Sequence, residues 1–331
     1  MRRPPASTDY RIGTLYAVLT ALLYAVQEPL SFPAAHRLTT IQFVCLTQVA
    51  LFLSVPLVTF RRQSRGDLLA LLAEPASYAK LAVIFAIGLT GLLLYSVGLG
   101  DAHPIIVSAI LNLLPFWAAL VALAISGVPI PVSPPLFFGC FAAAFLGAMM
   151  VAWSQVAAED QRTWNALVQN LLGGGWLYAL PVPVCTALGG TLVAKWFAKY
   201  DEAAAVAANF LFANVLLIPA TLVILARRTD FGFDGELPAV ALAVFGTIVA
   251  ASVGRVLFQI ALTVTGGDNG FVSMFLNLVP ALTAVISFAL SGWIPDLHFA
   301  FDLRFFLGLG LIAASLAMFS LRSWRAPARP C

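Results

Sequence analysis

The chain has 331 residues, of which 61% are hydrophobic and only 10% are charged, and its formal net charge is +3. A typical soluble domain is roughly 45–50% apolar and about 25% charged, so this composition excludes a water-soluble globule, a disordered chain, a collagen and a coiled coil. The net charge is too small to indicate a nucleic-acid partner. The composition therefore predicts an integral membrane protein whose outer surface meets lipid.

Apolar stretches of about 20 residues, the helical length that crosses a bilayer core, recur along the chain. They predict an all-α fold with ten transmembrane helices, near residues 12–32, 39–60, 80–100, 104–126, 134–156, 176–199, 203–226, 238–263, 269–291 and 303–322. The stretches are too long and too uniformly apolar for barrel strands. The gap after the first helix carries Pro33. The longer gaps, 61–79 and 157–175, fit either short interfacial helices or ordered loops.

The positions of Lys and Arg predict the orientation in the membrane. With the N-terminus inside, 12 of these residues fall in inner segments, 5 fall in outer segments, and Arg255 stays within a span. We therefore expect residues 1–11 and 323–331 to be cytoplasmic tails of a multi-pass protein of a bacterial inner (plasma) membrane. The N-terminal apolar run lacks a small-residue cleavage pattern, which favours a retained helix over a signal peptide.

A short sequence occurs twice. VSAILNLLP begins at residue 107 and VSMFLNLVP at residue 272, with six of nine positions identical. The identities include Asn112 with Asn277 and Pro115 with Pro280. Apolar composition alone does not predict a shared Asn and Pro in register, so we infer an internal duplication.

The duplication relates two five-helix units, residues 12–156 and 176–322, joined by a linker at 157–175. Because five is odd, the second unit enters the membrane from the opposite side, and the units become inverted repeats. Folds of this kind place a substrate site near the midplane between the repeats and operate by alternating access.

The segments that end each unit carry a family likeness. YSVGLGDAHPIIVSAILNLLPFWAALVALAISG leads into FFGCFAAAFLGAMMVAW, and FQIALTVTGGDNGFVSMFLNLVPALTAVISFALSG leads into FFLGLGLIAASLAMFS. In this respect the chain resembles the drug/metabolite transporter superfamily, in particular its EamA-like family. Many members carry a Gly-Glu pair where this chain has Ser-Gly-Val-Pro and Ser-Gly-Trp-Ile. The resemblance implies small-molecule transport, often export, through a central cavity lined by spans 1, 3, 4, 6, 8 and 9.

Two charges inside predicted spans call for a role. A mid-bilayer arginine costs roughly 2.5–3.5 kcal/mol on insertion scales, so Arg255 is either a cavity group for a carboxylate or phosphate, or a structural residue that caps carbonyls or snorkels. Glu28 precedes Pro29, which can kink the first helix. It is either a proton-coupling carboxyl or an interfacial side chain in water.

Uncharged candidates also lie within the predicted spans. Asn112 and Asn277 either bond between helices or contact a ligand at the repeat interface, and Pro115 and Pro280 are kink positions. Further polar candidates are Gln27, Gln155, Gln259 and Asn209. Aromatic candidates for the cavity wall are Tyr24, Tyr95, Trp117, Trp176 and Phe258, against a default of lipid-facing packing.

Three function classes remain open. A secondary transporter for a small metabolite is the first, and Arg255 favours an amino acid or another small anion over a drug-like cation or a nucleotide sugar. A membrane-embedded enzyme would need a catalytic constellation that the spans do not show. A non-transporting membrane partner is the third. No cofactor or metal is expected, since no CxxC or Cys/His cluster occurs. The expected partners are the substrate and membrane lipid, and a homodimer is compatible with the sequence.

Overall fold

The computed structural model describes residues 10–130, 132–154, 174–227, 237–264, 272, 275–276, 278–294, 297 and 301–325. Over these ranges the regular structure is helical, without a β-strand. Within the described part of the chain, seven helical segments are long and apolar enough to cross a membrane: Tyr10–Arg37, Thr40–Val58, Ala76–Asp101, Pro104–Ser126, Pro134–Ser154, Trp176–Trp196 and Leu237–Phe258. The expectation of a helical, multi-pass membrane protein is thereby confirmed in its coarse form.

The first half of the chain is described without long gaps. Its helices are α1 (Tyr10–Arg37), α2 (Thr40–Val58), α3 (Arg62–Leu72), α4 (Ala76–Asp101), α5 (Pro104–Leu111), α6 (Leu114–Ser126) and α7 (Pro134–Ser154). α2 begins at a capping box in which Thr39 and Gln42 satisfy each other's backbone N–H groups. α6 ends at Gly127, whose φ of 66° is a left-handed conformation that favours glycine.

The second half contains α9 (Trp176–Ala179), α10 (Val182–Trp196), α11 (Glu202–Arg227), α12 (Leu237–Ile248), α13 (Arg255–Val264), α15 (Val279–Leu290) and α16 (Leu303–Arg325). A π-helical segment, η2 (Val249–Gly254), joins α12 to α13 without a break. Such segments are rare, and they are frequent at functional sites.

The structure corrects one predicted boundary and adds detail at two other places. The expected end of the first helix at Pro33 is wrong, because α1 continues through Pro29 and Pro33 to Arg37. Membrane helices tolerate interior prolines where neighbouring helices satisfy the freed backbone groups. The gap at 61–79 contains the helix α3, and the predicted span at 104–126 is divided at Asn112 between α5 and α6. The predicted linker at 157–175 lies outside the described residues except for its last two.

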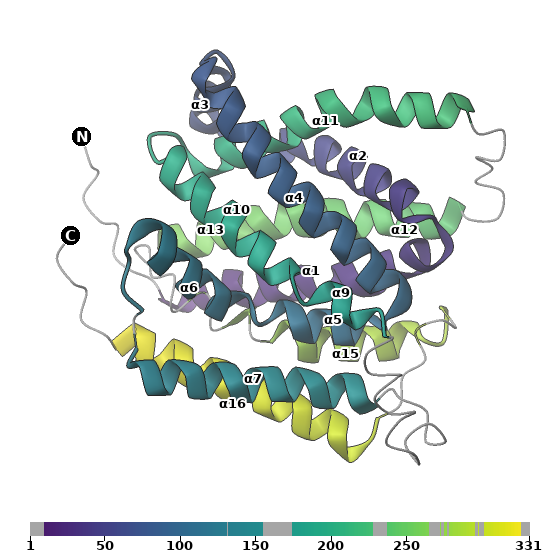
Figure 1. The fold of residues 1–331 in the computed structure, drawn as a ribbon, viewed down its shortest axis with the longest axis vertical. Helices are drawn as coiled ribbons and strands as arrows, with labels where there is room; N and C mark the ends of the chain where they lie inside the picture. The colour runs from purple at the N-terminus through teal and green to yellow at the C-terminus, as the bar shows by residue number, and fades with distance from the viewer. Residues whose placement is uncertain are drawn as a thin grey trace.

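α7 and α16 form a tight pair along one side of the molecule (Figure 1). A Cβ on Gly147 would lie 2.6 Å from the carbonyl oxygen of Gly308, and a Cβ on Gly308 would lie 2.6 Å from that of Gly147. Gly147 also meets Ile312, and Gly308 meets Val151, so the helices run antiparallel. Small residues let membrane helices approach this closely.

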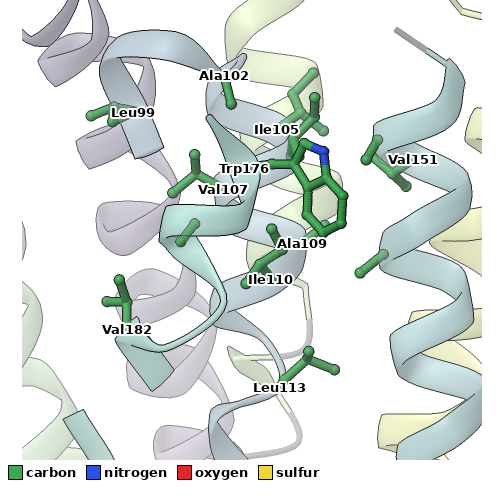
Figure 2. Packing of buried hydrophobic residues seen from close by; sticks show 14 of the residues in the cluster. Leu99, Ala102, Ile105, Val107, Ala109, Ile110, Leu113, Val151, Trp176 and Val182 are labelled. Atoms are coloured by element: carbon green, nitrogen blue, oxygen red, sulfur yellow. The ribbon is translucent and has the colours of Figure 1, made fainter. Parts of the chain in front are cut away.

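α1 occupies the middle of the bundle. It packs against α12, η2, α13 and α15, and also against α4 and α5. On the other side, α10 packs against α4 and α6, and α2 packs against α11. A cluster of buried apolar side chains fills the region where α4, α5 and α9 meet, as Figure 2 shows for Leu99, Ile105, Ile110 and Trp176.

Candidate functional site

A cavity of about 750 Å³ lies among α1, α2, α4, α10, α11 and the α12–α13 helix. Its volume is within the roughly 300–1,000 Å³ of small-molecule sites. The polar groups on its wall come from several different elements: Gln27, Glu28, Thr47, Tyr95, Thr186, Tyr200, Glu202, Asn209, Thr247 and Arg255. α2 and α11 contribute to the wall, which the family resemblance does not imply, and the described residues of α15 do not.

The cavity exists because α4 and α10 diverge along their length. Near one end α4 touches α9, the short helix that leads into α10, since a Cβ on Gly98 would lie 3.1 Å from that of Ala179. A Cβ on Gly91 would lie 3.0 Å from that of Cys185. Beyond this point Gly88 on α4 and Gly189 on α10 both border the cavity, and a Cβ on either would have no atom within 4 Å. The two helices therefore enclose a space that is closed where Gly98 lies and wide where Gly88 lies.

Glu28 is the acidic group deep in this space. It lies on α1, its relative exposure is 6%, and its Oε2 has no hydrogen-bond partner among the described residues. Tyr95 from α4 also borders the cavity, and its buried hydroxyl likewise lacks a described partner. An unpaired buried polar group is costly, so each offers a hydrogen bond to a ligand.

Arg255 borders the same cavity nearer the α10–α11 turn. Its Nη2 lies 2.7 Å from Oε1 of Glu202, the first residue of α11, and the two side chains are 31% and 50% exposed. Arg255 directly follows η2, where Gly254 allows close approach to the ring of Tyr24. The guanidinium therefore faces the cavity with its charge balanced by a protein carboxylate.

The α10–α11 turn is held by polar contacts to α3 and to the start of α4. Oε2 of Glu74 accepts hydrogen bonds from Lys199 Nζ at 2.9 Å, Tyr200 Oη at 2.7 Å and Ser77 Oγ at 3.2 Å. The bond from Lys199, followed by that from Tyr200, lowers the pKa of Glu74 from 4.5 to about 2. The same contacts raise the pKa of Lys199, chiefly through the bond to Glu74.

α3 contacts the same turn a second time. The backbone N–H of Asp201 donates to Oδ2 of Asp67 at 2.8 Å, and Ser64 Oγ donates to Oδ2 of Asp201 at 2.7 Å. Arg65 in turn donates to the carbonyls of Thr59 and Phe60 at the end of α2. α3 thus links the end of α2 to the α10–α11 turn.

The opposite end is held by packing and two histidines. The ring of Phe32 lies between His36 and His103, with centroid distances of 5.7 and 5.9 Å. His36 Nδ1 donates to the carbonyl of Gly100 at 2.8 Å, and His103 Nε2 donates to that of Leu297 at 3.3 Å. His103 Nδ1 accepts from the N–H of Ile105 and so caps α5. Burial lowers the pKa of His103 from 6.5 to about 4.

The structure brings five of the predicted candidates to one cavity: Gln27, Glu28, Tyr95, Asn209 and Arg255. Tyr24 packs on Gly254, and Phe258 belongs to a small apolar cluster with Ala17; neither is part of the cavity wall.

Asn112 acts locally in the described structure. Its Nδ2 donates to the carbonyl of Ser108 at 2.8 Å, which caps α5 at the break before α6. Pro29 lies inside α1, while Pro115 and Pro280 stand in the first turns of α6 and α15. Asn277 and the side chain of Gln259 lie outside the described residues.

Sequence reasoning did not single out several polar residues. Asn214 on α11 donates from Nδ2 to the backbone oxygen of Gln48 on α2 at 3.1 Å, and both residues are buried. Glu202, Thr47, Thr186 and Thr247 border the cavity. Asn214 could have been predicted as a site residue, because an amide within an apolar span is unusual. Glu202 could not, because it lies at a helix start.

Neither the family models nor the curated proteins compared with this chain give a match. Thirteen chains of solved structures match it. One, a protein of known crystal structure, is 18% identical, with 95% of this chain and 99% of that chain covered and a TM-score of 0.52. At this identity the likeness concerns the fold alone.

Proposed function

We propose that this protein is a secondary transporter that moves a small metabolite across the bacterial inner (plasma) membrane by alternating access. The observation that carries the proposal is the large cavity, which combines a buried carboxyl group with a wall of apolar and glycine residues. Metabolite-sized sites have this composition, with a few polar groups set in an apolar surface.

The proposed architecture is ten spans in two inverted five-helix repeats, with both termini cytoplasmic. Reciprocal packing supports it. Gly91 of α4 meets α10, and Gly254 of η2 meets α1, so the third span of each unit contacts the first span of the other. The antiparallel contact of α7 with α16 through Gly147 and Gly308 pairs the last spans of the two units in the same manner.

A second likeness concerns the repeated sequence. α6 begins after Leu113 with Pro115 in its first turn, and α15 begins after Leu278 with Pro280 in its first turn. Two packed halves with equivalent contacts have two arrangements of similar energy, which is the basis of alternating access. In this scheme, α4 and α10 separate near Gly98 as they approach each other near Gly88.

Glu28 is the proposed site of proton coupling. Tyr95 on α4 interacts electrostatically with Glu28, and the charged groups that border the same cavity are Glu202 and Arg255. Transport by Glu28→Gln with an unchanged pH dependence would exclude this role.

Solute release from proteoliposomes tests the transport function. The purified full-length protein is reconstituted around a ¹³C-labelled cell extract, and mass spectrometry follows the metabolites that leave the vesicles. We expect release of a small set of solutes and its loss in Gly189→Trp, which fills the cavity. Gly139→Trp on α7 is the control, because Gly139 has equal space but lies outside the cavity wall. Equal release from protein-free vesicles would reject the proposal.

A further inference from the structure

The charges on the cavity wall are not equivalent. Arg255 and Glu202 form an ion pair at 2.7 Å, so together they present no net charge to a ligand. Glu28 has no such partner, because its Oε2 lacks a hydrogen bond among the described residues. The unbalanced charged group of the cavity is therefore an acid, although the sequence alone favours a basic site at Arg255.

The environment of Glu28 suits a cation. An uncompensated carboxylate out of water is strongly unfavourable, and a charge-assisted hydrogen bond from an ammonium group relieves that cost. Gln27 and the Tyr95 hydroxyl border the same space and supply further acceptors for ammonium N–H groups.

Three glycines form part of the cavity wall. Gly88, Gly189 and Gly190 border the cavity, and a Cβ added to any of them would have no atom within 4 Å. Glycine inside a helix costs about 1 kcal/mol relative to alanine, so these positions give up helix stability for space. The apolar side chains of Leu92, Val193, Phe197 and Phe210 border the same region.

We propose that the cavity binds an organic cation, a protonated amine carried on a bulky apolar body, with the ammonium group at Glu28 and the apolar body against the glycine wall of α4 and α10. This inference rests on the proposed transport function and names its substrate class. Arg255, neutralised by Glu202, is then a residue of the cavity end and not an anion site.

Calorimetry with three matched probes tests the charge preference. The full-length protein in lipid nanodiscs is titrated with 3-phenylpropylamine, 3-phenylpropanol and 3-phenylpropionate, which differ only in the terminal group. We expect the amine to bind at least about tenfold more tightly than either other probe. In Glu28→Gln this preference disappears while the alcohol still binds, and Glu28→Asp retains part of it. Failure of the amine to bind, tighter binding of the acid, or an undiminished preference in Glu28→Gln would overturn the inference.

A bulkier amine tests the glycine wall. We expect wild type to bind 3,3-diphenylpropylamine at least as tightly as 3-phenylpropylamine. Gly189→Leu should weaken the diphenyl amine by about tenfold and the phenyl amine by less than about threefold. Gly139→Leu is the matched control and should change neither. An unchanged affinity of Gly189→Leu for the diphenyl amine would overturn the assignment of the wall.

The two proposals fail differently. If the amine binds through Glu28 but no solute leaves proteoliposomes, the cation site stands and transport does not. If solutes are released but Glu28→Gln leaves the amine preference intact, transport stands and the cation site does not.

Discussion

The two ends of the α4–α10 pair are held by different chemistry. At the end with Gly98, the backbone of α4 lies directly against Ala179, and the rings of Phe32, His36 and His103 pack together. At the end with Gly88 the helices stand apart, and ion pairs and hydrogen bonds around Glu74, Asp201 and Arg255 hold the α10–α11 turn. Apolar contact needs close fit, whereas exposed polar contacts exchange readily with water. The Gly98 end is therefore tightly packed, and the open space lies at the Gly88 end.

The stability of the Gly98 end should decrease with acid in a pH range set by His103. Because burial lowers the pKa of His103 to about 4 from 6.5, its contribution to stability is complete above pH 6.5 and is lost as the pH falls toward 4. Full protonation would remove about 3 kcal/mol. His103→Asn retains a capping side chain but cannot titrate, so its melting temperature in detergent should lack this decrease. A decrease equal to that of wild type would contradict the role of His103.

A larger side chain at the Gly98 end of α4 should destabilise the protein more than one at the Gly88 end. Gly98→Val places methyl groups against Ala179, and we expect a loss of about 1–3 kcal/mol in unfolding free energy. Gly88→Val points into open space and should cost less than about 1 kcal/mol, or be neutral. Thermal unfolding of both variants in the same detergent measures the difference. Equal losses would show that α4 is packed as tightly at Gly88 as it is at Gly98.

The polar end should lose stability at a lower pH. Glu74 has its pKa lowered to about 2 by Lys199 and Tyr200, so its contribution is present above pH 4.5 and declines between pH 4.5 and 2. Glu74→Gln should flatten this part of the melting-temperature curve and leave the His103 range unchanged. A curve that still falls between these values as in wild type would refute the Glu74 contacts.

The ion pair of Arg255 with Glu202 should matter least for stability. Both side chains are partly exposed, and pairs of this kind contribute about 0–1 kcal/mol. We expect Arg255→Gln to change the melting temperature little. The preference of the cavity for amines over acids should not weaken. Improved binding of 3-phenylpropionate on Glu202→Gln would show that the freed Arg255 can act as an anion site.

Hydropathy was sufficient to predict the helical membrane fold, since burial in lipid requires long apolar helices wherever they occur. It could not predict the break at Asn112 or the π segment at Val249–Gly254, because both depend on local hydrogen bonding and on neighbours such as Tyr24. Likewise, Pro33 looked like a helix end and is an interior residue of α1.

The candidate site was predictable in part. Glu28, Tyr95 and Arg255 stand out as polar or aromatic residues within apolar spans, and all three border the cavity. The partner of Arg255 could not be found, because Glu202 is 53 residues away and lies at a helix start where a carboxylate is common. Without it, Arg255 indicated an anionic substrate, and its pairing reverses that preference.

Reversible locking of the packed end tests alternating access most directly. A Cβ on Gly98 would lie 3.1 Å from that of Ala179, a few tenths of an ångström below the roughly 3.5–4.5 Å of a disulfide. After a small shift, Gly98→Cys with Ala179→Cys, in a chain whose native cysteines are replaced, should cross-link on oxidation. We predict that oxidation stops solute release from proteoliposomes and that reduction restores it. If the fully cross-linked protein released solutes as fast as the reduced protein, the proposal that this end opens during transport would be contradicted.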